Sequence, residues 1–96
     1  MAQFITRVEL HDYATGEQYQ TLHDAMQKEG FSRIITTNNG QKYNLPTAEY
    51  NRYDNVPVEN ILQSAERAAK TVGKRYSIIT SEIVRASIIG LHLVKK

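Results

Sequence analysis

The sequence contains no cysteine and no tryptophan, and it has only two prolines. Without cysteine the chain can form no disulfide, no thiolate metal site and no thiol nucleophile, which fits a reducing compartment. No stretch approaches the roughly 20 apolar residues of a membrane-spanning helix. The N-terminal MAQFITRVEL also lacks the basic and apolar regions of a signal peptide. We therefore expect a cytoplasmic protein without a membrane span.

The length leaves no room for a second domain. Ninety-six residues with 41% hydrophobic content suit one small domain over residues 1–96. The chain shows no repeat, no linker and no low-complexity segment.

The net charge of +2 hides an uneven distribution. Residues 1–66 hold five Lys/Arg against nine Asp/Glu, whereas residues 67–96 hold seven against one. The basic residues of this second part are Arg67, Lys70, Lys74, Arg75, Arg85, Lys95 and Lys96. Such a cluster suits a phosphate backbone or an acidic partner. Lys70 and Lys74 would equally suit the C-terminus of a helix, where cations are favoured anyway.

Periodicity predicts a strand and then a helix at the start of the chain. Residues 3–11 alternate, as in a half-buried strand. One face of this strand carries Phe4, Thr6, Val8 and Leu10, and the other carries Ile5, Arg7, Glu9 and His11. Apolar residues then recur at helical spacing, so we expect a helix near residues 16–29, capped by Thr15 or Asp12 and ended by Gly30.

The remaining elements follow from turn residues and composition. Residues 31–37 are rich in β-formers, and Asn38-Asn39-Gly40 favours a hairpin into residues 41–53, with a bulge or edge at Pro46. Pro57 can begin a second helix, which Gly73 ends, and residues 74–80 resemble a last main strand. The tail, residues 83–96, fits a helix and an edge strand equally.

This order of elements predicts an α+β, ferredoxin-like β-α-β-β-α-β sandwich. We expect a four-stranded antiparallel sheet with two helices on one face and a short C-terminal appendage. The uncovered face would carry Ile5 among charged residues, and the tail adds further apolar residues. A homodimer through the open sheet face or the C-terminal edge is therefore expected.

Short motifs within this order resemble a known family. These are Gly30-Phe31-Ser32-Arg33-Ile34-Ile35 after the first helix, Asn39-Gly40 in the hairpin, and an acidic residue closing the first strand. Over about residues 3–82 the chain resembles the family of the endoribonuclease antitoxin GhoS, which is similar in fold to the CRISPR spacer-acquisition nucleases. The resemblance implies a ribonuclease that cleaves messenger RNA without a required metal, in a bacterium or its phage. The His-Asp strand ending and the longer hairpin arm depart from this family.

Three residues are candidates for catalysis. Metal-independent RNA cleavage needs a base for the ribose 2′-OH and an acid for the leaving oxygen. His11 can titrate near neutrality, Asp12 can orient or assist it, and His23, expected on the exposed side of the first helix, is a second participant. The alternative is that Asp12 only caps a turn and that the histidines have no role.

Cationic side chains provide candidate RNA contacts. The candidates are Arg7, Arg33, Arg52, Lys74 and Arg75. Tyr43, Tyr50 and Tyr53 lie near Arg52 in sequence and could stack bases, although strand tyrosines more often pack in a core. No spacing of His and carboxylate residues fits a known metal site, and no cofactor is expected. The second hypothesis is a non-catalytic dimeric module that binds RNA or a protein partner.

Overall fold

The computed structural model describes residues 1–94, and the basic residues Lys95 and Lys96 lie outside this range. The elements in chain order are β1 (Ala2–Leu10), α1 (Gly16–Lys28), β2 (Ile34–Thr36), β3 (Lys42–Asn44), β4 (Glu49–Asp54), α2 (Val58–Lys70) and β5 (Tyr76–Ile83). The fold is thus α+β, with two helices and antiparallel sheets over the described residues.

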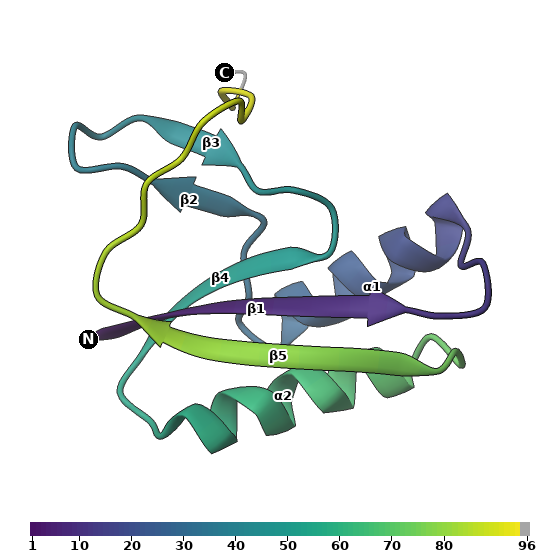
Figure 1. Ribbon diagram of the computed structural model, residues 1–96. Coiled ribbons are helices and arrows are strands. Elements are labelled where there is room, and N and C mark those ends of the chain that lie inside the picture. The colour runs from purple at the N-terminus through teal and green to yellow at the C-terminus, as the bar shows by residue number, and fades with distance from the viewer. Residues whose placement is uncertain (95–96) are drawn as a thin grey trace.

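The main sheet has three strands in the order β4-β1-β5, with β1 in the centre (Figure 1). Both neighbours run antiparallel to β1, so that Phe4 lies opposite Arg52, and Leu10 lies opposite Tyr76. Alternate residues of β1 are buried, from Phe4 through Leu10. The alternation predicted from the sequence is therefore confirmed.

The two helices begin and end close to where the sequence predicted. Thr15 caps α1 in a capping box, in which its side chain accepts from Gln18 N and the Gln18 side chain accepts from Thr15 N. Pro57 precedes the first turn of α2. That helix ends at Lys70, earlier than expected, and Gly73 takes its positive φ of 81° in the turn that follows.

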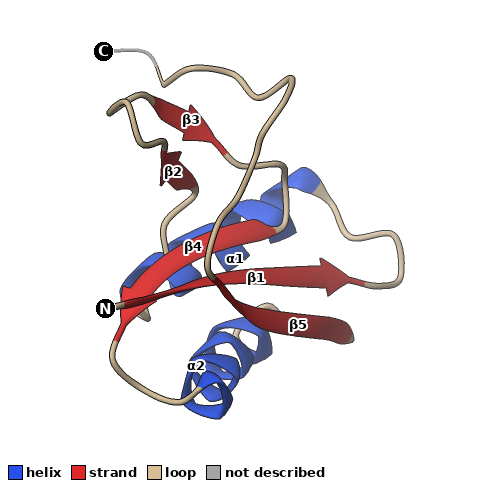
Figure 2. Cartoon of the chain, turned by 60° about the vertical axis from the view of Figure 1, so that its left-hand side comes forward, coloured by secondary structure: helices blue, strands red, loops and turns tan. Residues whose placement is uncertain are grey.

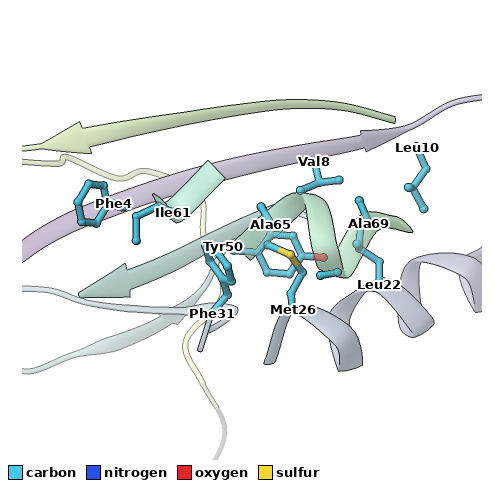
Figure 3. Packing of buried hydrophobic residues seen from close by; sticks show 11 residues of the cluster. Phe4, Val8, Leu10, Leu22, Met26, Phe31, Tyr50, Ile61, Ala65 and Ala69 are labelled. Atoms are coloured by element: carbon cyan, nitrogen blue, oxygen red, sulfur yellow. The ribbon is translucent and has the colours of Figure 1, made fainter. Parts of the chain in front are cut away.

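Both helices lie on the same side of the main sheet (Figure 2). Their apolar faces meet the buried face of β1 in one hydrophobic core (Figure 3). The core consists of Phe4, Val8, Leu10, Leu22, Met26, Phe31, Tyr50, Ile61, Ala65, Ala68 and Ala69. Burial of this apolar surface is the main force that holds the helices against the sheet.

The fourth strand expected in the main sheet is not confirmed. Residues 34–36 pair instead with β3 in a separate two-stranded sheet, and only the bridge between Ser32 and Asn51 joins this segment to β4. The expected long hairpin arm is broken between β3 and β4 because Pro46 has no N–H to donate and Ala48 has a φ of 76°. This break lets the β2–β3 hairpin turn out of the main sheet (Figure 1).

The tail beyond β5 crosses to this hairpin. Residues 84–94 form neither a helix nor a regular strand. Leu93 makes an isolated bridge to Tyr43, Asn44 N donates to His92 O at 2.9 Å, and Val94 N donates to Lys42 O at 3.0 Å. The tail therefore ties the end of the main sheet to the outer edge of β3 (Figure 1). Within residues 1–94, neither helix has the length and apolar character needed to cross a membrane.

Candidate functional site

The end of β1 and the start of β5 bring two loops together. Leu10 and Tyr76 are partners in the sheet, and just beyond them His11 N donates to Arg75 O at 2.9 Å. The loop after β1 and the loop before β5 consequently lie side by side. We call His11, Asp12, Tyr13, Lys74 and Arg75 the strand-end cluster.

Asp12 forms a bidentate ion pair with Arg75 across the strand-end cluster. Its Oδ1 accepts from Arg75 Nη2 at 2.6 Å and its Oδ2 accepts from Arg75 Nε at 2.9 Å. Lys74 Nζ donates to the main-chain oxygen of Asp12 at 2.7 Å. The hydrogen bonds from Arg75 lower the pKa of Asp12 below its usual value. Asp12 is therefore ionised near neutral pH and suited to holding Arg75 in place, but it is a weak proton acceptor.

His11 follows the last residue of β1 and is half-buried. Its Nε2 lies 2.7 Å from Ser77 Oγ on the neighbouring strand. This contact holds the imidazole ring, and the residue stays partly exposed to solvent. Sequence reasoning missed Ser77, because only the register between β1 and β5 brings it beside His11.

Tyr13 is the most exposed residue of the strand-end cluster, with a relative exposure of 102%. Both Asp12 and Tyr13 have positive φ angles, of 61° and 56°. A non-glycine residue held in this region costs roughly 1–3 kcal/mol. Sequence reasoning did not single out Tyr13, although its place between a strand and a capped helix was a usable signal.

His23 belongs to a different part of the molecule from His11. It lies on α1, where its Nδ1 is 2.6 Å from the hydroxyl of Tyr50 on β4. Burial, followed by the positive charge of Arg33, lowers the pKa of His23. Burial also raises the pKa of Tyr50, which is 1% exposed. His23 is thus a half-buried, hydrogen-bonded residue rather than the exposed one that was expected.

Arg33 and His23 line the same cavity of about 470 Å³, beside α1 and the start of β2. Arg33 Nη2 donates to Leu45 O at 2.7 Å, and its guanidinium lies over the Tyr50 ring, 5.7 Å from the centroid. Arg33 is therefore grouped with His23 and apart from Lys74 and Arg75.

The other two candidate arginines do not join either group. Arg52 pairs with Asp54, with Nη2 2.5 Å from Oδ2, and its Nη1 donates to Glu29 O at 2.7 Å. Its guanidinium also lies over the ring of Phe31, so its contacts are those of a packing residue. Arg7 is exposed on the open face of the sheet, where its strand partners are Glu49 and Ile79.

The three tyrosines considered for RNA stacking do not share one environment, although Tyr43 and Tyr53 line the same cavity. Tyr50 is in the core, Tyr43 is half-buried beside the tail, and Tyr53 is 48% exposed. They do not form one stacking surface. Over residues 1–94, no three His, Asp or Glu side chains come close enough to hold a metal ion together.

Comparisons with known proteins are sparse. No family model matches the chain, and no curated protein matches it. A crystal structure of the hypothetical protein MJ1052 from Methanocaldococcus jannascii is similar, with a TM-score of 0.47 and 12% identity over 93% of this chain and 87% of that one. A likeness this distant carries no argument about function.

Proposed function

We propose that this protein binds single-stranded RNA at the strand-end cluster and cleaves it there, as an endoribonuclease of the GhoS-like antitoxin kind. The observation that carries the proposal is the gathering of His11, Lys74 and Arg75 at the end of β1, where the chain continues into the fully exposed Tyr13. Exposed aromatic rings beside cationic side chains suit stacked bases and the phosphates between them.

The arrangement of elements supports the same proposal. The sheet order β4-β1-β5, with both helices on one side, matches three strands of a ferredoxin-like sheet. In this reading, Ser32 and its bridge to Asn51 stand where the fourth strand would pair. The GhoS-like family, which the sequence resembles, and the CRISPR spacer-acquisition nucleases, which are similar to that family in fold, have this arrangement.

His11 is the general base of the proposed reaction. With its Nε2 donating to Ser77 Oγ, its Nδ1 accepts the proton of the ribose 2′-OH. The 2′ oxygen bonds to phosphorus, the bond to the 5′ oxygen breaks, and the leaving oxygen takes a proton from solvent. The products are a 2′,3′-cyclic phosphate and a 5′-hydroxyl end.

The other members of the strand-end cluster bind and position the RNA. Lys74 and Arg75 contact the phosphate whose negative charge grows during attack. Asp12 is a positioning residue in this scheme, since its carboxylate holds the Arg75 guanidinium. Tyr13 stacks on a neighbouring base.

A second candidate function is a non-catalytic dimeric module that binds RNA or a protein partner. The observation in its favour is Ile79, which is 65% exposed on the open sheet face beside Arg7 and near the half-buried Ile5. An apolar residue of this size on an uncovered sheet face suits an interface. In this alternative the strand-end cluster binds without cleaving.

End-labelled single-stranded RNAs of varied sequence, incubated with the protein in the presence and absence of a chelator, separate the two candidates. We expect cleavage that survives the chelator and falls roughly 10²–10⁴-fold in His11→Ala, the usual effect of removing a positioned base. His92→Ala, which changes an exposed histidine of the tail, is the matched control and should cleave normally.

Three results would count against the proposed cleavage site. RNA that binds but stays intact across all sequences favours the non-catalytic module. Cleavage that persists in His11→Ala places the reaction elsewhere. Absence of both binding and cleavage removes RNA as the ligand of the strand-end cluster.

A further inference from the structure

The outer side of β5 is an edge of the main sheet that has no partner strand within residues 1–94. β5 stands at one end of the order β4-β1-β5, with β1 on its inner side (Figure 1). At the opposite end, beside β4, Ser32 N donates to Asn51 O at 2.8 Å and Asn51 N donates to Ser32 O at 2.7 Å, so that edge is partly occupied. An unpaired edge presents main-chain N–H and C=O groups, which makes it a template for another strand.

The register of β1 and β5 identifies the main-chain groups that face outward. His11 N donates to Arg75 O, and this pair continues the register of the two strands. Because hydrogen-bonded pairs alternate along an antiparallel ladder, the odd-numbered residues of β5 bond to β1. Val8 N donates to Ala48 O, which agrees, since the even-numbered residues of β1 then bond to β4. The even-numbered residues of β5 therefore turn their N–H and C=O groups outward, and these are Tyr76, Ile78, Thr80 and Glu82.

This edge lacks the features that usually protect a sheet edge. Such edges are commonly short, bulged, or marked by proline and lysine, which discourage a further strand. β5 has 8 residues and contains neither proline nor lysine, and Glu82 is its one charged residue. Its pairing with β1 runs without a bulge from Tyr76 to Ile83. An edge of this length and regularity suits the addition of a partner strand.

An apolar groove lies beside this edge. It is a cavity of about 250 Å³ between α2 and β5, and its lining includes Val58 and Leu62 from the helix and Ile78 from the strand. Leu62 is 41% exposed there. The side chain of Ile78 lies on the helix side of the sheet, because its partner in β1 is the buried Val8. A strand added to β5 would place alternate side chains on this same side, over the groove.

Two carboxylates stand near the carboxyl end of β5. Glu82 is next to the last residue of the strand, and Glu59 lines the groove together with Thr80. Both glutamates are exposed, and neither takes part in an ion pair within residues 1–94. Two neighbouring negative charges without a counter-charge attract a cation. In a strand antiparallel to β5 the amino end lies beside Glu82, so a basic residue is favoured at that end.

We propose that the outer edge of β5 binds an extended peptide segment, which adds to the main sheet as an antiparallel strand. The segment has apolar residues at alternate positions and a basic residue at its amino end. Its residues opposite Ile78 and Thr80 make the main-chain hydrogen bonds, and the apolar side chains of the same residues cover Leu62. This binding uses the main chain of β5 and is independent of the proposed RNA cleavage.

A synthetic peptide in which valine alternates with threonine after two amino-terminal lysines is the probe. We expect saturable binding of the labelled peptide, measured by fluorescence anisotropy. Amide exchange followed by NMR locates the peptide on the protein. In the free protein the amides of Ile78 and Thr80 should exchange quickly, whereas those of Ile79 and Ser81 are protected by β1. Saturating peptide should slow exchange at Ile78 and Thr80 by roughly 10-fold or more.

Two methylated peptides separate strand addition from binding through side chains alone. One carries methyl groups on its valine nitrogens and the other on its threonine nitrogens. When the valine side chains enter the groove, the valine N–H groups face β5, so their methylation should weaken binding roughly 10- to 100-fold. Methylation of the threonines should change the affinity by less than about threefold, because their N–H groups face solvent.

Further changes test the charge and the groove. The reversed peptide, with its lysines at the carboxyl end, and the variant Glu82→Gln should each weaken binding roughly twofold to fivefold, as expected for an exposed ion pair. Leu62→Lys should weaken binding about 10-fold, because the valines lose an apolar contact. Gln63→Lys adds the same charge to α2 at an exposed position outside the groove and should bind as the wild type does.

The wild-type protein with the two methylated peptides is decisive if Leu62→Lys fails to fold. The inference is overturned if the unmodified peptide does not bind, or if both methylated peptides bind equally well. Protection that appears at amides outside β5 instead of at Ile78 and Thr80 also overturns it. A peptide that binds at β5 while lowering the mass of the protein in light scattering would assign this edge to a second copy of the chain, which contradicts a peptide ligand.

Discussion

Tyr13 combines full exposure with an unfavourable backbone conformation. Its φ of 56° follows a φ of 61° at Asp12, and its ring contributes nothing to the core. Residues in this region persist only where the surrounding contacts hold them. Here the capped start of α1 on one side and the Asp12–Arg75 pair on the other hold the loop. The strain presents an aromatic ring to solvent, which fits a role in stacking.

Replacing Tyr13 with Gly should raise the stability of the fold while it weakens the binding of RNA. Gly adopts positive φ without strain, so we expect a gain of up to about 1 kcal/mol in the free energy of unfolding, after the greater entropy of the unfolded chain is counted. RNA affinity should fall by about 1–3 kcal/mol, the usual value of one base–aromatic stack. Thermal melts and RNA titrations on the same preparation measure both. Tyr13→Phe, which keeps the ring, should bind RNA normally, and unchanged binding in Tyr13→Gly would show that the ring does not stack.

Asp12→Asn should show how the ion pair with Arg75 depends on pH. The pKa of Asp12 is lowered on folding from 3.8, so the folded protein binds fewer protons than the unfolded chain in that range. The stabilising contribution is therefore present above pH 3.8 and is lost as the pH falls through the lowered value. We expect the variant to melt below the wild type at pH 6, with a gap that closes toward pH 2. Asn tolerates the positive φ, so backbone strain does not confuse the comparison.

The same experiment contains its own control. Asp54 also has a lowered pKa, chiefly through hydrogen bonds from Arg52, and it titrates in both proteins. The difference between wild type and variant therefore isolates Asp12. A difference in melting temperature that is the same at every pH would mean that the ion pair contributes nothing to stability.

At the level of elements, the start of α1 anchors the loop that carries Asp12 and Tyr13 of the strand-end cluster. The capping box of Thr15 and Gln18 fixes the first turn, and the strained loop ends directly before it. An uncapped first turn frays, because its N–H groups lose their acceptors. Fraying here would release Tyr13 and Asp12 together.

Thr15→Ala should consequently lower the free energy of unfolding by about 0.5–2 kcal/mol, the usual cost of removing an N-cap. Denaturant melts measure this, and amide exchange at Gln18 locates the loss. Thr47→Ala is a matched control, because Thr47 is an exposed residue in the turn between β3 and β4. Its change should stay within about 0.5 kcal/mol. Equal effects of the two substitutions would contradict a specific cap.

At the level of the whole molecule, one face of the main sheet is covered by the helices and the other is not (Figure 2). The open face mixes Arg7 and Glu9 with Ile79, which is 65% exposed. A second copy of the chain would remove this apolar surface from water.

We therefore predict a homodimer through the open face, which light scattering would show as twice the mass of 11.0 kDa. Ile79→Lys should yield a monomer, because a charge buried in that interface lacks a partner. Val84→Lys changes a residue that is 97% exposed beyond β5 and should leave the dimer intact. A wild-type protein of monomer mass would exclude this interface, and a monomer produced by Val84→Lys would assign it to the tail.

Short-range patterns were enough to predict most of the elements. The alternation along β1 and the Thr15 cap of α1 depend on residues within a few positions of each other, and the structure confirms both. The start of α2 after Pro57 also depends on a local cause, because a proline at the start of a helix lacks only an N–H that would have no partner there. The spacing of apolar residues and the capping of helices depend on residues within one strand or one helical turn. Both can therefore be recognised without knowledge of the rest of the fold.

By itself the sequence thus determined the α+β class, both helices and the central strand, and it identified His11, Asp12 and Arg75 as candidates. Only the tertiary structure decided what these residues contact. Asp12 and Arg75 are 63 residues apart and His23 and Tyr50 are 27 apart, and sheet register and helix packing bring them together. Residues 34–36 form a strand, but they pair with β3 outside the main sheet, where the break at Ala48 separates β3 from β4. Such outcomes depend on the balance of distant contacts, which no local pattern contains.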